Sequence, residues 1–411
     1  MVLPDHRKIG RQLGIFASSD VCGPGLPLWL PAGTAVRDEL ERFVVELERE
    51  AGYEHVHTPM LAKRALYERS GHWVHYRADM WPPMDMNGEQ VVLRPMLCPH
   101  HILIYESEAR SARRLPVRIA EVGAMFRRER SGSVGGLSRV RQMTLNDGHV
   151  FAAPDQVGKE VASILGLIGR AYRTLRLPKP RLRLSLHGES DKYAAAPGIW
   201  LRSEAALRGV LDKLGMDYEQ APGEAAFYGP KIDIQVRDPL GREQTLSTVQ
   251  LDFHLPERFG LKYRSGTGEA VPVMVHRSIV STMERMVAHL LEVHAGALPF
   301  WISPVQVLVL PATGDALAYA VEVHAALGKV GIRAELDSRD ETLGARVRDA
   351  RHKHFPCMVV VGEREMTNRS VSVRGPGGRQ HEELALGPFV DKLREASRLR
   401  APDVAVAGHP S

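Results

Sequence analysis

Three side chains of the kind that bind transition metals, Cys98, His149 and His276, each lie at the end of a segment with the pattern of a β-strand. One cysteine and two histidines would leave the fourth position of a tetrahedral zinc ion open, which is typical of a catalytic rather than a structural site. The three positions are far apart in the chain, and the sequence has 18 histidines, most of which serve structure or face solvent. Residue types therefore suggest a zinc site here, but spacing alone does not require it.

A second group of charged residues gathers in residues 121–151, which have the pattern of two strands joined by a loop rich in Gly, Ser and Arg. In a strand, Arg127 and Glu129 share one face because they are two residues apart. The same rule places four residues of the second strand on one face: Met143, Leu145, Asp147 and His149. Loop glycines allow close backbone approach, and Arg139 and Arg141 suit a polyanion. For this stretch alone, an ordinary surface hairpin remains the alternative.

Composition describes an ordinary globular protein with enough apolar residues for a sizeable core. The chain has 411 residues, of which 44% are hydrophobic and 25% are charged, with a formal net charge of +5. That mild excess is compatible with a nucleic-acid partner without requiring one. Three scattered cysteines are too few for a disulfide framework, and the sequence shows neither a signal-peptide pattern nor a long apolar run. We therefore expect a cytoplasmic protein without a membrane segment.

The elements that must position these residues change character near residue 302. Before it, periodicity predicts helices at 34–50, 61–70, 98–110, 155–175, 200–214 and 278–294 and strands at 54–59, 90–96, 181–188, 227–237 and 244–253, with an aromatic loop at 71–81. Within residues 227–237, Ile232, Ile234 and Val236 should face inward and Lys231, Asp233 and Gln235 the other way. After residue 302, strands alternate with helices, which predicts a small α/β domain over 302–400. Residues 401–411 read as a disordered tail.

Several motifs resemble the threonyl-tRNA synthetases, which are class II aminoacyl-tRNA synthetases. They are DHRKIGRQL, SGHW, RPMLCPHH, FRRERSGS with GLSRVRQMTLNDGHVF, AFYGPKIDI, STVQLDFHLPERF and VPVMVHRSIVSTMER. The resemblance covers nearly the whole chain. It implies an α+β catalytic domain over residues 1–301, built on an antiparallel sheet flanked by helices, followed by a C-terminal α/β anticodon-binding domain. It also implies a homodimer formed through the first class II motif.

For ATP and catalysis, the resemblance implies roles for residues of the central hairpin and of the third motif. Arg127 would hold the amino-acid carboxylate and the α-phosphate, which stabilises charge as the adenylate forms. Glu129 would contact the adenine, next to Met143, and Arg139 the γ-phosphate. Arg285 would clamp the phosphates from the opposite side, and Mg²⁺ would bridge them.

For the amino acid and the tRNA, the resemblance implies that Cys98, His149 and His276 hold zinc, which takes the amine and hydroxyl of threonine. Asp147 would accept the hydroxyl proton. Further residues on the substrate side would be Met96, Tyr228, Lys231 and Gln250, with Lys231 among the catalytic side chains. Anticodon bases of tRNA(Thr) would be read by Arg348, Glu365, Arg374 and Asp340, the last in place of a family asparagine.

The chain also departs from the family pattern. Met143 replaces a phenylalanine, Leu145 a glutamine, residues 245–247 a Gln-Cys-Gly run near zinc and nucleotide, and Ser281 and Thr282 a Gly-Ser pair. The N-terminal domains, including the one that hydrolyses mischarged Ser-tRNA, have no counterpart in this sequence, so we expect an enzyme without editing. Two alternatives stay open. One is a specialised or inhibitor-resistant paralogue acting on a related amino acid or another acceptor, and the other is a catalytically impaired tRNA-binding protein.

Overall fold

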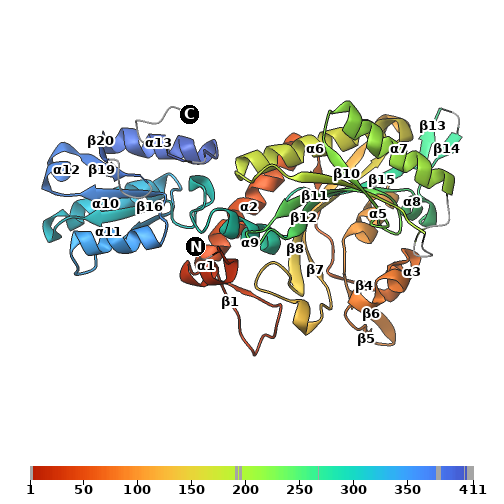
Figure 1. Ribbon diagram of the computed structural model, residues 1–411, viewed down its shortest axis with the longest axis horizontal. Helices are drawn as coiled ribbons and strands as arrows, with labels where there is room; N and C mark the ends of the chain where they lie inside the picture. The colour runs from red at the N-terminus through yellow and green to blue at the C-terminus, as the bar shows by residue number, and fades with distance from the viewer. Residues whose placement is uncertain are drawn as a thin grey trace.

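The computed structural model describes residues 3–189, 193, 197–266, 268–375, 381–401 and 403–404. Its strands form one eight-stranded sheet, one five-stranded sheet and three small sheets. The elements of the five-stranded sheet all come from the last quarter of the chain and form a separate body, seen in blue in Figure 1. Among the described residues, we find no helix with the length and apolar character needed to cross a membrane.

The large sheet has the order β10-β9-β11-β12-β15-β8-β7-β3. Its strands are β3 (Glu54–His55), β7 (Val117–Phe126), β8 (Gln142–Ala152), β9 (Arg181–Leu186), β10 (Tyr218–Pro222), β11 (Lys231–Arg237), β12 (Glu243–Asp252) and β15 (Val273–Ser278). The pairs from β9 to β7 are antiparallel, and the two outermost pairs are parallel. The last of these strands in the chain, β15, lies in the middle between β12 and β8.

One face of this sheet packs on long helices. They are α2 (Pro31–Glu50), α6 (Val157–Thr174), α7 (Pro197–Lys213) and α9 (Met283–Val293), with α1 (His6–Gln12) against α9. Helix α2 buries residues such as Val36, Leu40 and Phe43, which recur at helical spacing and so form one apolar stripe. Alternate residues of the strands, including Ile232 and Val249, join the same core.

The opposite face carries the polar residues of the strands and is partly covered by shorter elements. Helices α5 (Cys98–Glu106) and α8 (His254–Arg258) pack there on a second cluster that includes Ile119, Phe151 and Met274. Beside them lie α3 (Arg64–Arg69), α4 (His72–His75) and a three-stranded sheet of β4 (Leu61–Lys63), β5 (Met84–Met86) and β6 (Glu89–Leu93). Two short hairpins pair β1 (Phe16–Ala17) with β2 (Leu28–Trp29) and β13 (Tyr263–Ser265) with β14 (Gly268–Ala270). This polar face is where the candidate site lies.

The C-terminal sheet has the order β17-β16-β18-β19-β20. Its strands are β16 (Val307–Pro311), β17 (Ala334–Leu336), β18 (Cys357–Val361), β19 (Ser370–Arg374) and β20 (His381–Ala385), and its helices are α10 (Leu317–Lys329), α11 (Leu343–His352), α12 (Glu363–Asn368) and α13 (Leu386–Arg398). Arg333 ties this body to the first one, because it pairs with Glu39 of α2 at 2.6 Å and donates to the Trp301 carbonyl at 2.8 Å.

The expected sheet of mostly antiparallel strands flanked by helices and the α/β C-terminal domain are confirmed, but several local predictions are wrong. Residues 61–63 form strand β4 rather than the start of a helix, because Leu61 pairs with Leu93 of β6. The expected loop at 71–81 contains α4. Cys98 opens helix α5 instead of ending a strand, and α12 and β20 were not predicted. Residues 402 and 405–411 lie outside the described residues, so the disordered tail stays a prediction.

Candidate active site

Four polar side chains form a single row across the polar face of the large sheet. Lys231 of β11 lies opposite Gln250 of β12, Gln250 opposite His276 of β15, and His276 opposite His149 of β8. Residues directly opposite each other share a sheet face. The alternation predicted for residues 231–237 is therefore confirmed, and the sheet register itself brings together two of the three expected metal ligands.

The third expected ligand, Cys98, reaches this row from the first turn of α5. One ligand atom from each of Cys98, His149 and His276 lies within 4.8 Å of the others, and all three residues are buried. His149 Nε2 and His276 Nδ1 are 3.0 Å apart. The structure thus brings together residues that are widely separated in the chain.

Hydrogen bonds behind the two histidines orient their free nitrogens toward one another. His276 Nε2 lies 2.8 Å from the Asp252 carboxylate, which holds the proton on that nitrogen and leaves Nδ1 unprotonated. His101 Nε2 lies 3.2 Å from Glu121, and His101 Nδ1 lies 2.7 Å from His149 Nδ1. If His101 donates to Glu121, its Nδ1 accepts from His149, and His149 Nε2 is left unprotonated.

In that tautomer, the unprotonated nitrogens of His149 and His276, 3.0 Å apart, would repel each other unless a cation lay near them. Together with the Cys98 sulfur they form a donor set suited to zinc, supported by the carboxylate–histidine contacts that metal sites use. Burial lowers the pKa of His149 well below the usual value of histidine. Burial also raises the pKa of Cys98 well above the usual value of cysteine. A bound cation would reverse the effect on the thiol, since metal coordination deprotonates cysteine. The residues present therefore fit a zinc ion.

Asp147 and Tyr228 border this group. An Asp147 oxygen lies 3.9 Å from His149 Nε2, and burial raises the pKa of this carboxyl. The ring of Tyr228 stacks on His276 with centroids 4.9 Å apart, and its hydroxyl donates to Gln250 at 2.6 Å. These groups offer an acceptor and a polar wall beside the metal ligands.

Two other expected substrate residues are Lys231, which forms an ion pair, and Met96, which packs against an apolar cluster. The ammonium group of Lys231 lies 2.5 Å from Asp233. Met96 is half-buried against the cluster formed by α5 and α8. Both residues lie on the polar side of the sheet.

Positively charged groups gather beyond the end of β7. Strand β7 stops at Phe126, so Arg127 and Glu129 lie in the connection rather than on the strand. Glu129 pairs with Arg139 at 2.8 Å. Burial lowers the pKa of Arg285, as do the charges of Arg127 and Arg139, with Glu129 opposing them. Three guanidinium groups and one carboxylate, which pairs with Arg139, thus influence one another, and the net positive charge suits phosphates.

The positions that depart from the family pattern do not all face this site. Ser247 lies on the helix-covered face, where its hydroxyl contacts Tyr172 of α6 at 3.0 Å and donates to a backbone carbonyl. Leu246 belongs to the same core. Only Thr245 of this run contacts the polar side, accepting from Gln235 at 2.8 Å. The interpretation that residues 245–247 all border zinc and nucleotide is therefore wrong.

The remaining departures lie near β8 and the start of α9. Leu145 is half-buried against a cluster that includes the buried Met143. Ser281 adopts φ +61°, a left-handed conformation, at the position where the family pattern has glycine. Thr282 caps α9 by accepting from the Arg285 N–H at 3.1 Å. These substitutions change uncharged residues that pack beside the site, and they leave its charged side chains in place.

The expected anticodon residues lie on different elements of the C-terminal domain. Arg348 is exposed on α11, and Asp340 is exposed in the segment after β17. Glu365 accepts from the Gly362 N–H at 3.0 Å and so caps α12. Arg374 lies opposite Met358 at the start of β18. No contact in the described residues joins these four into one cluster.

Sequence patterns missed the residues that contact the expected metal ligands. These are His101, Glu121, Asp252 and, through a 3.7 Å contact between its Nε2 and the Cys98 sulfur, His72. Arg94 was missed as well, and it pairs with Glu121 at 3.0 Å where both are almost fully buried. The motifs RPMLCPHH, SGHW and STVQLDFHLPERF contain Arg94, His101, His72 and Asp252, but neither residue type nor periodicity assigned a role to any of them.

Comparisons with known proteins agree with this geometry. Residues 76–294 match the family described as tRNA synthetase class II core domain (G, H, P, S and T), and residues 306–396 match the anticodon binding domain. A threonine–tRNA ligase of Halalkalibacterium halodurans is 49% identical over 399 residues, covering 96% of this chain and 62% of that protein. Threonine–tRNA ligase 1 of Bacillus subtilis is also 49% identical, over 94% of this chain and 61% of its own length.

Solved structures give the same result. A structure titled the RNA binding domain of threonyl-tRNA synthetase from Cryptosporidium parvum Iowa II has a TM-score of 0.91 and 34% identity, with 99% of each chain covered. A putative threonyl-tRNA synthetase from Aeropyrum pernix has a TM-score of 0.84 and 26% identity, with 97% of each chain covered. The present chain spans a little over three-fifths of the length of the curated relatives it matches. On its sequence and its fold, the chain belongs to the threonyl-tRNA synthetase family of class II aminoacyl-tRNA synthetases.

Proposed function

We propose that this chain activates L-threonine with ATP to form threonyl-adenylate and transfers the threonyl group to tRNA(Thr). The observation that carries the proposal is a zinc-type donor set beside a buried carboxylate, with the charge of Arg127 acting both on Cys98 and on Arg285. The printed names of the curated relatives support the same substrate.

Selection of threonine would depend on the row of side chains around Asp147. A zinc ion held by Cys98, His149 and His276 would supply a Lewis acid for the amine and hydroxyl of the amino acid. Asp147 accepts the proton of the substrate hydroxyl, and Tyr228 closes the opposite side. Valine would leave the buried Asp147 carboxyl without a partner and is rejected strongly, whereas serine lacks only a methyl group, worth about 1–3 kcal/mol.

Adenylate formation would rest on the arginine group. Arg127 holds the threonine carboxylate near the α-phosphate, and Arg285 holds the phosphates from the other side. Arg139 takes the γ-phosphate, and Glu129 contacts the adenine next to Met143. ATP enters as its Mg²⁺ complex. These fixed positive charges stabilise the charge that develops during in-line attack, with Lys231 adding another cation on the amino-acid side.

Transfer requires tRNA, which the C-terminal domain would recognise. In this proposal, residues 1–301 form the catalytic domain, and residues 302–400 bind the anticodon through Arg348, Glu365, Arg374 and Asp340. The homodimer remains a prediction from the family resemblance, and the cytoplasmic location remains a prediction from the composition.

A second candidate function is activation of a related amino acid, or transfer to a different acceptor. Leu145 is the observation that favours it, because an apolar side chain lies on β8 in place of the amide that the family pattern has there. Adenylate formation without tRNA charging would point to this candidate.

The test is ATP–pyrophosphate exchange by zinc-loaded protein with threonine, serine and valine, followed by charging of tRNA(Thr). Exchange with threonine, weaker exchange with serine, none with valine, and tRNA charging would agree with the proposal. Exchange that is absent for every amino acid would contradict it and leave a tRNA-binding role. Zinc content is measured on the same preparation, so that a metal-free sample is not mistaken for an inactive enzyme.

A further inference from the structure

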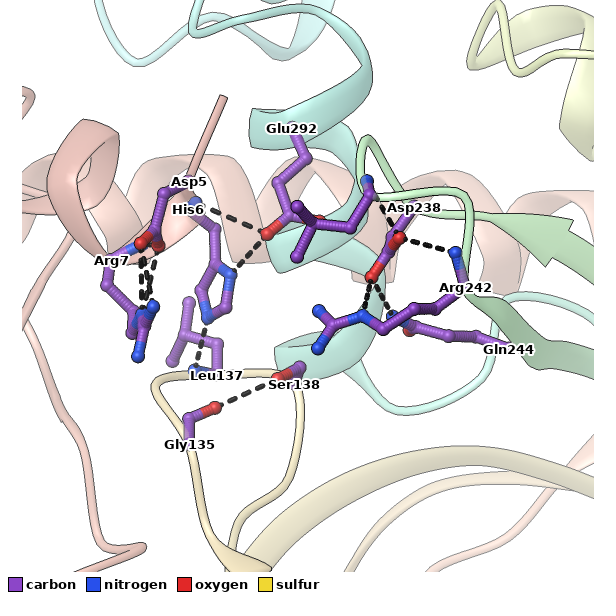
Figure 2. A network of polar contacts seen from close by, with 11 residues as sticks. Asp5, His6, Arg7, Gly135, Leu137, Ser138, Asp238, Arg242, Gln244 and Glu292 are labelled. Carbon is purple, nitrogen blue, oxygen red and sulfur yellow. Dashed lines mark hydrogen bonds and ion pairs between the residues drawn. The ribbon is translucent and has the colours of Figure 1, made fainter. Parts of the chain in front are cut away.

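A buried histidine at the start of the chain connects two elements that carry the proposed ATP-binding arginines. His6 lies on α1, and its side chain is 7% exposed. Figure 2 shows its ring between Glu292 of α9 and the loop that holds Leu137. His6 contacts none of the groups that would bind substrate, so its position calls for another explanation.

The hydrogen bonds define the protonation state of this ring. The Leu137 N–H donates to His6 Nε2 at 3.2 Å, so Nε2 carries no proton. A neutral imidazole then has its proton on Nδ1, which donates to the Glu292 carboxylate at 2.7 Å. The ring therefore bridges a buried backbone N–H and a carboxylate, and both of its nitrogens form hydrogen bonds.

The loop that receives this contact is fitted closely to the histidine. Gly136 has φ +52°, and a Cβ atom on it would lie 2.2 Å from His6 Nε2. The next residue, Leu137, is fully buried, so its N–H would have no water partner if His6 were absent. Glycine at position 136 and histidine at position 6 thus depend on each other.

The same loop is held by Arg285 one residue further on. Arg285 Nε donates to the Ser138 carbonyl at 3.2 Å, and Arg139 follows directly in the chain. Arg285 and Glu292 are seven residues apart on α9, about two helical turns, so they lie on the same side of that helix. Consecutive backbone groups of the loop are therefore fixed from one helix, by Arg285 directly and by Glu292 through His6.

We propose that His6 is a positioning residue for ATP, which sets the backbone of residues 136–138 and thereby the place of Arg139 and the orientation of Arg285. This inference rests on the proposed function, since it assigns the loop to the phosphates. It goes beyond it by giving α1 a role in nucleotide binding without a contact to the nucleotide.

Two substitutions separate the two contacts of the ring. In His6→Asn the amide reaches about as far as Nδ1, so it can donate to Glu292 but leaves the Leu137 N–H without an acceptor. In His6→Gln the amide oxygen reaches about as far as Nε2 and can accept from Leu137. We expect the KM for ATP to rise about tenfold in His6→Asn, since an unpaired buried donor is costly. In His6→Gln we expect it to stay within about threefold of wild type.

The readout is the KM for ATP and for threonine in the exchange assay, with equilibrium ATP binding measured by calorimetry. The KM for threonine should stay within about twofold in both variants, because the amino-acid residues lie on other strands. Lys8→Gln, at an exposed position of the same helix, is the matched control and should change neither constant. Glu292→Gln, which keeps an acceptor for Nδ1 but removes the charge, should give a smaller rise in the KM for ATP than His6→Asn. If His6→Asn does not fold, a rise in the KM for ATP in Glu292→Gln without a change in the KM for threonine supports the proposal, and an equal change in both overturns it.

Equal effects of His6→Asn and His6→Gln, or equal effects on the KM for ATP and for threonine, would overturn the proposal and leave His6 a structural residue. Wild-type protein that binds ATP but shows no exchange would contradict the proposed function alone, and the His6 comparison would then be read from ATP affinity. Wild-type protein that does not bind ATP would overturn both.

Discussion

Replacing Asp252 by asparagine should weaken zinc binding although Asp252 is not among the proposed metal ligands. Its Oδ2 accepts from His276 Nε2 at 2.8 Å, while its Oδ1 accepts from the backbone N–H groups of His254 and Leu255 at 2.9 and 2.8 Å. The carboxylate therefore accepts on both oxygens at once. Asparagine has one oxygen and one NH₂ group, so it cannot do the same.

The magnitude follows from the two orientations open to the amide. With its oxygen toward the backbone of α8, the NH₂ group faces His276 Nε2 and favours a proton on Nδ1, the atom that points to the metal site. Loss of such a partner behind a ligand lowers metal affinity about 10- to 100-fold. With its oxygen toward His276, the helix loses its cap, at about 1 kcal/mol. We expect the lost partner of His276 to determine the fall in zinc affinity. The loss of stability should not exceed the cost of the lost cap, about 1 kcal/mol.

The assay is a competition titration of zinc against a chromophoric chelator, with unfolding measured in parallel. Asp238→Asn is the matched control. Asp238 is also buried and also accepts from two backbone N–H groups, of Leu240 and Arg242 at 2.9 Å each, but it does not contact the proposed ligands. Asp238→Asn should keep wild-type zinc affinity. Unchanged affinity in Asp252→Asn, or an equal loss in both variants, would refute the role given to Asp252.

Three further predictions concern the site and its support. Cys98→Ser should lose zinc and exchange activity together, as measured by metal analysis and pyrophosphate exchange; a metal-free variant with full activity would contradict the zinc assignment. Ser281→Gly should raise the free energy of unfolding by about 0.5–1 kcal/mol, since it removes the strain of a side chain in the left-handed conformation but adds backbone entropy to the unfolded chain. Urea unfolding that shows no gain would mean that Ser281 is unstrained. Burial raises the pKa of Glu284 to about 7, above the unfolded value, so wild-type stability should fall as pH rises from about 4.5 to 7. Glu284→Gln keeps the acceptor for the Thr144 N–H, so it should match wild type at pH 4 and exceed it at pH 8, by up to about 3 kcal/mol; thermal unfolding that shows the same difference at both pH values would reject this explanation.

Elements with strong local patterns were predictable from the sequence. Helix α2 has a continuous apolar stripe, and the alternation in β11 correctly assigned Ile232 to the core and Lys231 to the polar face. Each pattern depends on neighbours within a few residues, so periodicity is enough. The boundary of β4 failed because Leu61 is held by Leu93, thirty-two residues away, and no local feature marks that pairing.

The site was predictable in its ligands and not in their support. Residue type suggested Cys98, His149 and His276 as a set, the family motifs supported it, and the structure brings the three together. Asp252 and His101 act only through contacts made across strands and helices, and aspartate and histidine at such positions are common in any sequence. The position of Ser247 was misjudged because residues 245–247 were placed as one run from the family resemblance, whereas alternation from Gln250 puts Ser247 opposite Ile234 on the core face.

The central position of β15 has a consequence for how the protein is made. Residues 98 and 149 are synthesised long before residue 276, and β8 and β12 can join only when β15 has entered between them. During synthesis a zinc ion would therefore meet only two of its three proposed ligands until β15 closes the middle of the sheet. If the chain binds zinc, the three-ligand site can form only after β15 has been synthesised.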